Sequence, residues 1–158
     1  MAEELDDDIN ARIEALAAEA DALAETEDFE AALDKYWDAF ELLPEPKTQW
    51  QQGTWLLSAI GEANFFQGDF AAGRENLSMA MHYPDAIGNP FLHLRLGQCQ
   101  FELDNLDRAA DELMRAYMAE GAEIFAEEDP KYLAFLSTRA KGVDVPGEAK
   151  KKPFWKVW

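Results

Sequence analysis

The chain has 158 residues, 48% of them apolar, and carries 32 acidic side chains against 14 lysines and arginines. The net charge of −18 repels nucleic acids and anionic membranes, so neither is an expected partner. The mean hydropathy of −0.37 and the lack of a long apolar run argue against a transmembrane helix. The length favours one domain. The acidic start is unlike a secretion signal and the single cysteine cannot form an internal disulfide, so we expect the protein in the cytoplasm.

The charge is unevenly distributed along the chain. Residues 1–44 hold 15 acidic and two basic side chains, a local net charge of −13. Residues 141–158 hold five lysines and two acidic residues, a local net charge of +3. An acidic field of this kind favours a basic partner, but a solvated surface that serves solubility explains the charge equally well.

Helical periodicity and capping signals predict helices along most of the chain. They are expected over residues 9–25, 29–42, 48–66, 70–81, 90–102, 106–119 and 130–142. We expect residues 1–8 to be disordered, with Asp8 as the cap of the first helix. Gly53 marks a place where the third of these helices can be interrupted. Pro90 and Pro130 suit the first turns of their helices.

The central feature is the segment 60–83, two short helices joined by a turn at Gly68 and Asp69. Its second helix alternates large and small residues at helical spacing, at Phe70, Gly73, Leu77 and Ala80. The same alternation occurs 41 residues earlier and 36 residues later, at Phe29, Ala32, Tyr36 and Ala39, and at Leu106, Ala109, Leu113 and Ala116. Three copies in one register indicate an internal repeat.

This pattern resembles the tetratricopeptide repeat, a helix–turn–helix unit of about 34 residues. The resemblance covers residues 13–121. It implies an all-α fold, a right-handed stack of about three units within a helical domain over residues 9–142. The units are expected at residues 13–44, 54–87 and 90–121, with capping helices over 122–142 and an irregular basic and aromatic tail over 143–158.

The tail combines lysines with aromatic side chains that are costly to leave in water, Phe154, Trp155 and Trp158. Two placements are open. In the first, the tail folds back on the helices and directs its lysines to the acidic side. In the second, the tail is free and its aromatic side chains bind a partner.

No catalytic or metal-binding pattern is found in the sequence. The two histidines, His82 and His93, belong to different units, and no set of side chains has the spacing of metal ligands. We expect Cys99 to be a small buried residue and His93 to be packed or hydrogen-bonded. The prediction is a protein that is not an enzyme and that uses no cofactor.

In tetratricopeptide proteins, ligands usually lie along the concave surface that the first helices of the units form. The resemblance therefore implies a partner-binding groove with these residues: Ala17, Asp21, Ala24, Glu25, Trp55, Ser58, Glu62, Phe65, Phe66, Phe91, Leu94, Gln98, Phe101 and Glu102. Family members that bind acidic chaperone C-termini carry basic residues here, whereas this chain has Asp21, Glu62 and Glu102. An apolar, basic protein or peptide is the expected ligand, although Phe65 and Phe101 also suit the core between units.

Several roles fit a small acidic repeat protein. The segment DPKYLAFLSTR, residues 129–139, resembles small bacterial repeat proteins linked to polymorphic-toxin loci. That resemblance implies an immunity protein, which would bind and neutralise a basic toxin domain. A cytoplasmic chaperone for a secretion-system substrate and a general adaptor or scaffold are the alternatives. The identity of the partner and the oligomeric state stay open.

Overall fold

The computed structural model describes residues 3–143, and every regular element in this range is a helix. The elements are α1 (Asp7–Glu25), α2 (Phe29–Glu41), η1 (Lys47–Gln49), α3 (Gln51–Gln67), α4 (Phe70–Ala80), α5 (Pro90–Glu102), α6 (Leu106–Glu120), η2 (Gly121–Phe125) and α7 (Pro130–Arg139). The predicted all-α class is confirmed. None of these helices is both long and apolar enough to cross a membrane.

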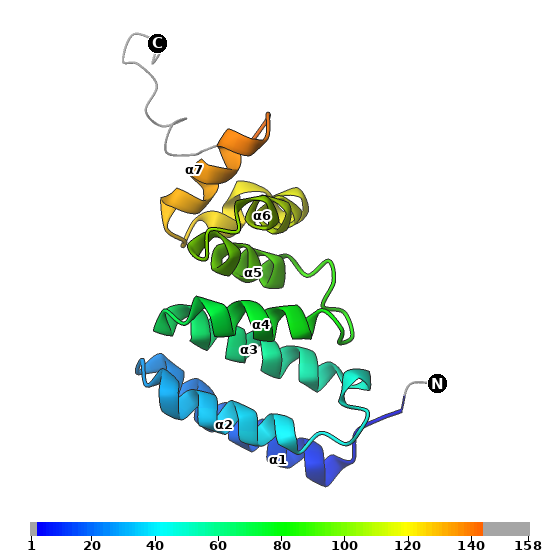
Figure 1. Ribbon diagram of the computed structural model, residues 1–158. Coiled ribbons are helices and arrows are strands. Elements are labelled where there is room, and N and C mark those ends of the chain that lie inside the picture. Colours follow the sequence, from blue (N-terminus) through cyan, green and yellow to red (C-terminus); the bar gives the residue numbers. More distant parts are fainter. Residues whose placement is uncertain (1–2, 144–158) are drawn as a thin grey trace, which may run out of the picture.

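The helices form three pairs that are stacked in chain order. Each of α1, α3 and α5 packs against the helix that follows it, and α2 with α3 and α4 with α5 join one pair to the next. Figure 1 shows this row of pairs. The last pair consists of α5 and α6, and α7 lies at that end of the row. The first helices of the three pairs are therefore neighbours along the stack.

The turn inside each pair has the same hydrogen bond. In all three, the residue after the turn donates its backbone N–H to a carbonyl five residues earlier, at 2.9 Å. The bonds run from Asp28 to Leu23, from Asp69 to Asn64 and from Asn105 to Gln100. Equivalent turns lie 41 and 36 residues apart, which is the spacing that the side-chain pattern predicts.

Small residues on the first helices let the two helices of each pair pack closely. A Cβ atom on Gly61 would lie 2.4 Å from Leu77 Cγ, and one on Gly97 would lie 2.8 Å from Leu113. Such distances are too short for any side chain at these positions. In the first pair, Ala20 and Tyr36 stand at the equivalent places, and the methyl group of Ala20 is fully buried.

The start of the chain differs from the expectation. The cap of α1 is Asp6 and not Asp8, because the Asp6 carboxylate accepts from the backbone N–H groups of Asp8 and Ile9 at 3.0 and 3.2 Å. Leu5 is buried in the core of the first pair. The expected disorder of residues 1–8 therefore does not hold for residues 5–8, because Leu5 is buried, Asp6 caps α1, and Asp7 and Asp8 form its first turn.

Gly53 does not interrupt α3, which is continuous from Gln51 to Gln67. A Cβ atom at position 53 would lie 2.4 Å from the ring of Tyr83. The glycine therefore permits close approach of the segment after α4.

At the other end, α7 stops at Arg139, three residues before the expected boundary. Val143 packs on the last hydrophobic cluster, and the predicted placement of the tail concerns residues 144–158, which lie outside the described residues.

Candidate functional site

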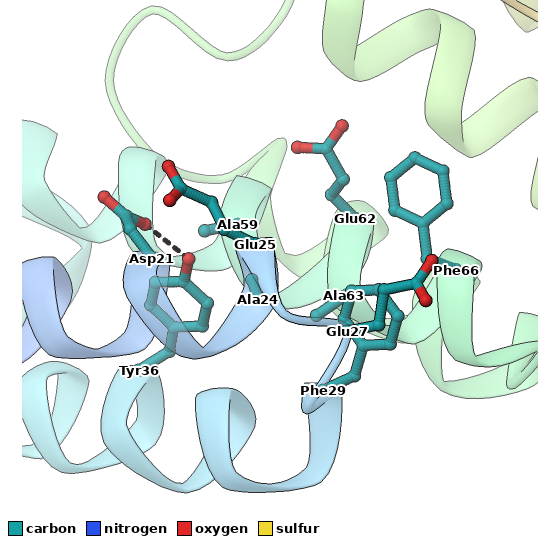
Figure 2. A pocket seen from close by; sticks show the side chains of 10 residues that line it. All are labelled: Asp21, Ala24, Glu25, Glu27, Phe29, Tyr36, Ala59, Glu62, Ala63 and Phe66. Atoms are coloured by element: carbon teal, nitrogen blue, oxygen red, sulfur yellow. Dashed lines mark hydrogen bonds between the residues drawn. The ribbon is translucent and has the colours of Figure 1, made fainter.

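Three adjoining pockets follow the first helices α1, α3 and α5, and we call them together the groove. The largest, the acidic pocket, has a volume of about 560 Å³ and lies between α1, α3 and the start of α2. Figure 2 shows its lining residues: Asp21, Ala24, Glu25, Glu27, Phe29, Tyr36, Ala59, Glu62, Ala63 and Phe66. The structure therefore brings together five of the predicted groove residues, Asp21, Ala24, Glu25, Glu62 and Phe66.

Two smaller pockets adjoin the acidic pocket. The Trp55 pocket, about 220 Å³, lies toward the start of α1 and shares Asp21, Tyr36 and Ala59 with it. The predicted residues Ala17 and Trp55 line this pocket. The Arg95 pocket, about 190 Å³, shares Glu62 and contains the predicted residues Ser58, Phe91 and Leu94 beside Arg95.

The acidic pocket has four carboxylates, and no lysine, arginine or histidine is among its lining residues. Asp21 accepts a hydrogen bond from the Tyr36 hydroxyl at 2.5 Å, and Glu62 pairs with Arg95 Nη2 at 2.8 Å. Glu25 and Glu27 are exposed, and their side chains make neither a hydrogen bond nor an ion pair within residues 3–143. Two carboxylates are thus free to pair with a cation from outside.

Aromatic side chains lie beside these carboxylates. Phe66 stacks on Phe29 with ring centroids 6.1 Å apart, and both belong to the wall of the acidic pocket. Trp55 is 57% exposed, Phe66 53% and Phe91 65%, so large apolar surfaces stay in contact with water along the groove. Exposed aromatic groups next to polar ones are typical of protein-binding surfaces.

Arg95 is a groove residue that the sequence analysis missed. Its guanidinium lies 5.0 Å from the ring centroids of both Phe65 and Phe66. It also donates to Gln98 Oε1 and to Glu62 at 2.8 Å each, and it forms a short ion pair with Glu128. The signal was present, because position 95 lies one helical turn after Phe91 and shares its face.

Five further residues of the acidic pocket were not predicted: three lie outside the first helices, to which the prediction was limited, and two are small residues of α3. Glu27 and Phe29 belong to the turn and start of the second helix, and Tyr36 lies about two turns further along α2. Ala59 and Ala63 are small residues of α3 that leave the space between the helices open.

Three predicted groove residues, Gln98, Phe65 and Phe101, line none of the three pockets, and Leu94 lines the Arg95 pocket from a buried position. Gln98 is fully buried and donates from Nε2 to Glu128 at 2.7 Å, and Leu94 packs in the cluster formed with α7. Phe65 and Phe101 are half-buried among the aromatic contacts with Tyr132, which agrees with the alternative that they belong to the core between units.

Glu102 joins α5 to α7 and does not face the groove as a free carboxylate. It accepts a hydrogen bond from the Tyr132 hydroxyl at 3.0 Å and pairs with Lys131 Nζ at 2.5 Å. Burial, followed by the hydrogen bond to Glu102, raises the pKa of Tyr132. The hydroxyl therefore stays protonated and acts as a donor.

The groups with potential reactivity outside the groove are used in packing. Cys99 is buried, and burial raises its pKa to about 12, so the thiol is not ionised near neutral pH. His93 is buried as predicted; its Nε2 accepts from the Gly88 N–H at 2.8 Å, so its Nδ1 donates to Glu112, 2.5 Å away. Within residues 3–143, no group of three or more His, Cys, Asp or Glu side chains is placed to bind a metal ion.

No protein-family model matches this sequence, and no curated protein is significantly similar to it. The ligand of the groove must therefore be inferred from its shape and charge.

Proposed function

We propose that this protein is a non-enzymatic interaction module that binds a basic segment of another protein in the groove, and that its three helix pairs are tetratricopeptide repeats. The observation that carries the proposal is the acidic pocket. Glu25 and Glu27 have no cation in residues 3–143, and the exposed ring of Phe66 lies beside them. A lysine or arginine side chain from a partner supplies the missing charge.

The chemistry of the pocket suits such a side chain in two ways. The carboxylates pair with the cation, and the neighbouring rings contact its aliphatic carbons and its charge. The local net charge of −13 in residues 1–44 also attracts a basic partner from a distance and raises the association rate. The exposed rings of Trp55 and Phe91 offer apolar contacts on either side of the acidic pocket.

For the biological role, we propose an immunity-type protein of a bacterial toxin system, acting in the cytoplasm. A toxin domain that binds phosphates must present a basic surface, and an acidic groove is complementary to that surface. A chaperone for a secretion-system substrate is the second candidate, because the three pockets form a line that suits an extended segment. An adaptor or scaffold would use the same groove without inhibiting or protecting its partner.

Binding is tested with two double variants that carry the same change in charge. Glu25→Lys with Glu27→Lys alters the acidic pocket, whereas Asp34→Lys with Asp38→Lys alters exposed positions of α2 that line none of the three pockets. The probe is a labelled peptide of alternating lysine and phenylalanine, and the readout is its dissociation constant.

We expect the pocket variant to lose at least tenfold more affinity than the α2 variant, about 1.4 kcal/mol. Equal losses would show that the peptide responds to net charge only and would contradict the proposed groove.

The role is tested separately by growth. The intact protein should rescue cells that express one basic toxic domain, and the Glu25→Lys, Glu27→Lys variant should not. A chaperone would instead keep an insoluble substrate in solution without restoring growth, which would contradict the immunity role and leave the groove intact.

A further inference from the structure

We propose that the lysine-rich end of this chain, residues 144–158, occupies the groove of its own molecule and competes there with the partner. The proposal rests on the proposed function of the groove. It uses the sequence of this segment, the position at which the described chain ends, and the geometry of the groove.

The first argument is complementarity of charge and apolar surface. Residues 144–158 contain four lysines, Lys150, Lys151, Lys152 and Lys156, and two acidic residues. The aromatic residues Phe154 and Trp155 precede Lys156, and Trp158 follows it. The groove combines the free carboxylates Glu25 and Glu27 with exposed aromatic rings. The segment thus has the composition that the groove requires of a partner.

The rest of the chain does not satisfy the acidic pocket. Residues 3–143 contain ten lysines and arginines, and seven of these form ion pairs with carboxylates. None of the ten lines the acidic pocket. The acidic pocket therefore receives no cation from residues 3–143, and the four lysines of residues 144–158 are the other cations of this chain.

The second argument is the place at which the described chain ends. Arg139, the last residue of α7, pairs with Asp107 Oδ1 at 2.8 Å, so α7 ends next to the start of α6 and its turn with α5. The acidic pocket includes Glu27 and Phe29 from the equivalent turn between α1 and α2. Because the repeats are stacked in register, both turns belong to the same edge of the stack.

The third argument is length. Packed helix axes are about 8–10 Å apart, so the three steps from α7 through α5 and α3 to α1, which ends at Glu25, cover about 24–30 Å. An extended chain covers about 3.3 Å per residue, so Lys150–Lys152 reach roughly 23–30 Å beyond Val143. The lysines thus reach the acidic pocket, and the six residues after Lys152 carry the aromatic side chains onward along the groove.

An occupant on the same chain has a consequence for binding. Its effective concentration at the groove is in the millimolar range for a short linker, so a partner must displace it to bind. The measured affinity for a basic partner is then lower than the affinity of the open groove. The segment acts as an internal competitor that excludes weak basic ligands.

Contact is tested in the full-length protein by carbodiimide coupling, which joins a lysine amine to a carboxylate that it touches. We expect amide links between Lys150–Lys152 and Glu25 or Glu27, and their loss in about 0.5 M NaCl, where exposed charges are screened. A mixture of isotope-labelled and unlabelled protein separates links within one chain from links between two. Links only to Asp34 and Asp38, or only between different chains, would overturn the proposal.

Competition is tested by Lys150→Gln, Lys151→Gln and Lys152→Gln together in the full-length protein. We expect this variant to bind the lysine–phenylalanine peptide at least threefold more tightly than the parent protein. The control removes three charges elsewhere, with Arg108→Gln, Arg115→Gln and Lys141→Gln, and should change the affinity by less.

Two failures can be told apart. If the parent binds the peptide and this depends on Glu25 and Glu27, but the three tail substitutions leave the affinity unchanged, the competition is wrong and the groove stands. If the Glu25→Lys, Glu27→Lys variant binds as the parent does, both the proposed function and this inference are wrong.

Discussion

Tyr36 donates its hydroxyl to the Asp21 carboxylate at 2.5 Å, and this hydrogen bond joins α2 to α1 in the wall of the acidic pocket. Tyr36 stands at the repeat position that Leu77 and Leu113 occupy in the other pairs, where both leucines are fully buried. The longer side chain fills the same core position and extends to the groove. One residue of the first repeat therefore connects the core with the candidate site.

The hydrogen bond of Tyr36 should contribute measurably to stability. We expect Tyr36→Phe to lower the free energy of unfolding by about 1–2 kcal/mol, because Asp21 loses a donor from a partly buried pair. Tyr83→Phe is the control, since Tyr83 is also buried but its hydroxyl makes no hydrogen bond in the described residues. If urea titrations give the same decrease in the free energy of unfolding for both variants, the hydrogen bond to Asp21 contributes nothing to stability.

Alkaline pH should destabilise the fold through its tyrosines. Burial raises the pKa of Tyr36, Tyr83 and Tyr132, and hydrogen bonds to Asp21 and Glu102 raise those of Tyr36 and Tyr132 further. An unfolded tyrosine ionises near pH 10, below these folded values. The stabilisation is therefore fully present below pH 10 and is lost as the pH rises above it.

The measurement is the urea midpoint at pH 8 and at pH 11. The parent should unfold at a lower urea concentration at pH 11, and Tyr36→Phe should show a smaller difference between the two. The same midpoint at both pH values in the parent would contradict the raised pKa values.

The helices and their repeat register could be predicted because their signals are local. Asp28, Asp69 and Asn105 mark equivalent turns in the sequence, and Gly61 and Gly97 mark close helix contacts. Each signal lies within a few residues of the chain, and its recurrence after 41 and 36 residues reveals the repeat register.

The accessibility of individual groove residues could not be predicted from one helix at a time. Gln98 and Glu102 have the right helical spacing to face the groove, but Glu128 and Lys131 cover them. Both covering residues belong to the segment after α6, whose position relative to α5 does not follow from periodicity. Arg95 was missed because the expected groove was acidic and aromatic, although its helical position alone would have included it.

The contact between α4 and α5 should show a measurable coupling. A Cβ atom on Gly73 would lie 2.8 Å from Cys99 Sγ, and both positions are buried. We expect Gly73→Ala to lower the free energy of unfolding by about 1–3 kcal/mol through overpacking. Adding Cys99→Ala removes the sulfur and should recover at least about 0.5 kcal/mol relative to the sum of the single changes. Strict additivity in a double-mutant cycle would contradict this contact.

In the turn between α1 and α2, Glu27 should lower the stability of the fold but contribute to peptide binding. Glu27 has φ +63°, a left-handed conformation, whereas Gly68 stands at the equivalent place in the second pair with φ +83°. Side chains in this region cost about 1–2 kcal/mol, partly offset by the greater unfolded entropy of glycine. Glu27→Gly should therefore stabilise the fold by about 0.5 kcal/mol and weaken binding of the lysine–phenylalanine peptide.

Asp104→Gly makes the same backbone change at φ +63° in a turn that lines none of the three pockets. It should raise the thermal midpoint without affecting peptide affinity. If Glu27→Gly binds the peptide as the parent does, Glu27 is not part of the binding site.

Arg95 should be the most important charged residue for the stability of the stack. It lies on α5, pairs with Glu62 on α3 and with Glu128 before α7, and covers the rings of Phe65 and Phe66. The side chains of Arg95 and Glu128 are each only 14% exposed. Removing one partner of a poorly solvated pair leaves the other charge uncompensated, so Arg95→Met should cost about 3 kcal/mol.

The matched control is Arg139→Met, because Arg139 pairs with an Asp107 side chain that is 97% exposed and such pairs contribute about 0.5 kcal/mol. Adding Glu128→Gln to Arg95→Met should recover part of the loss, since it removes the uncompensated charge. If Arg95→Met and Arg139→Met shift the urea midpoint equally, Arg95 does not stabilise the stack. Its charge would then act only at the groove surface, where peptide affinity would still report its removal.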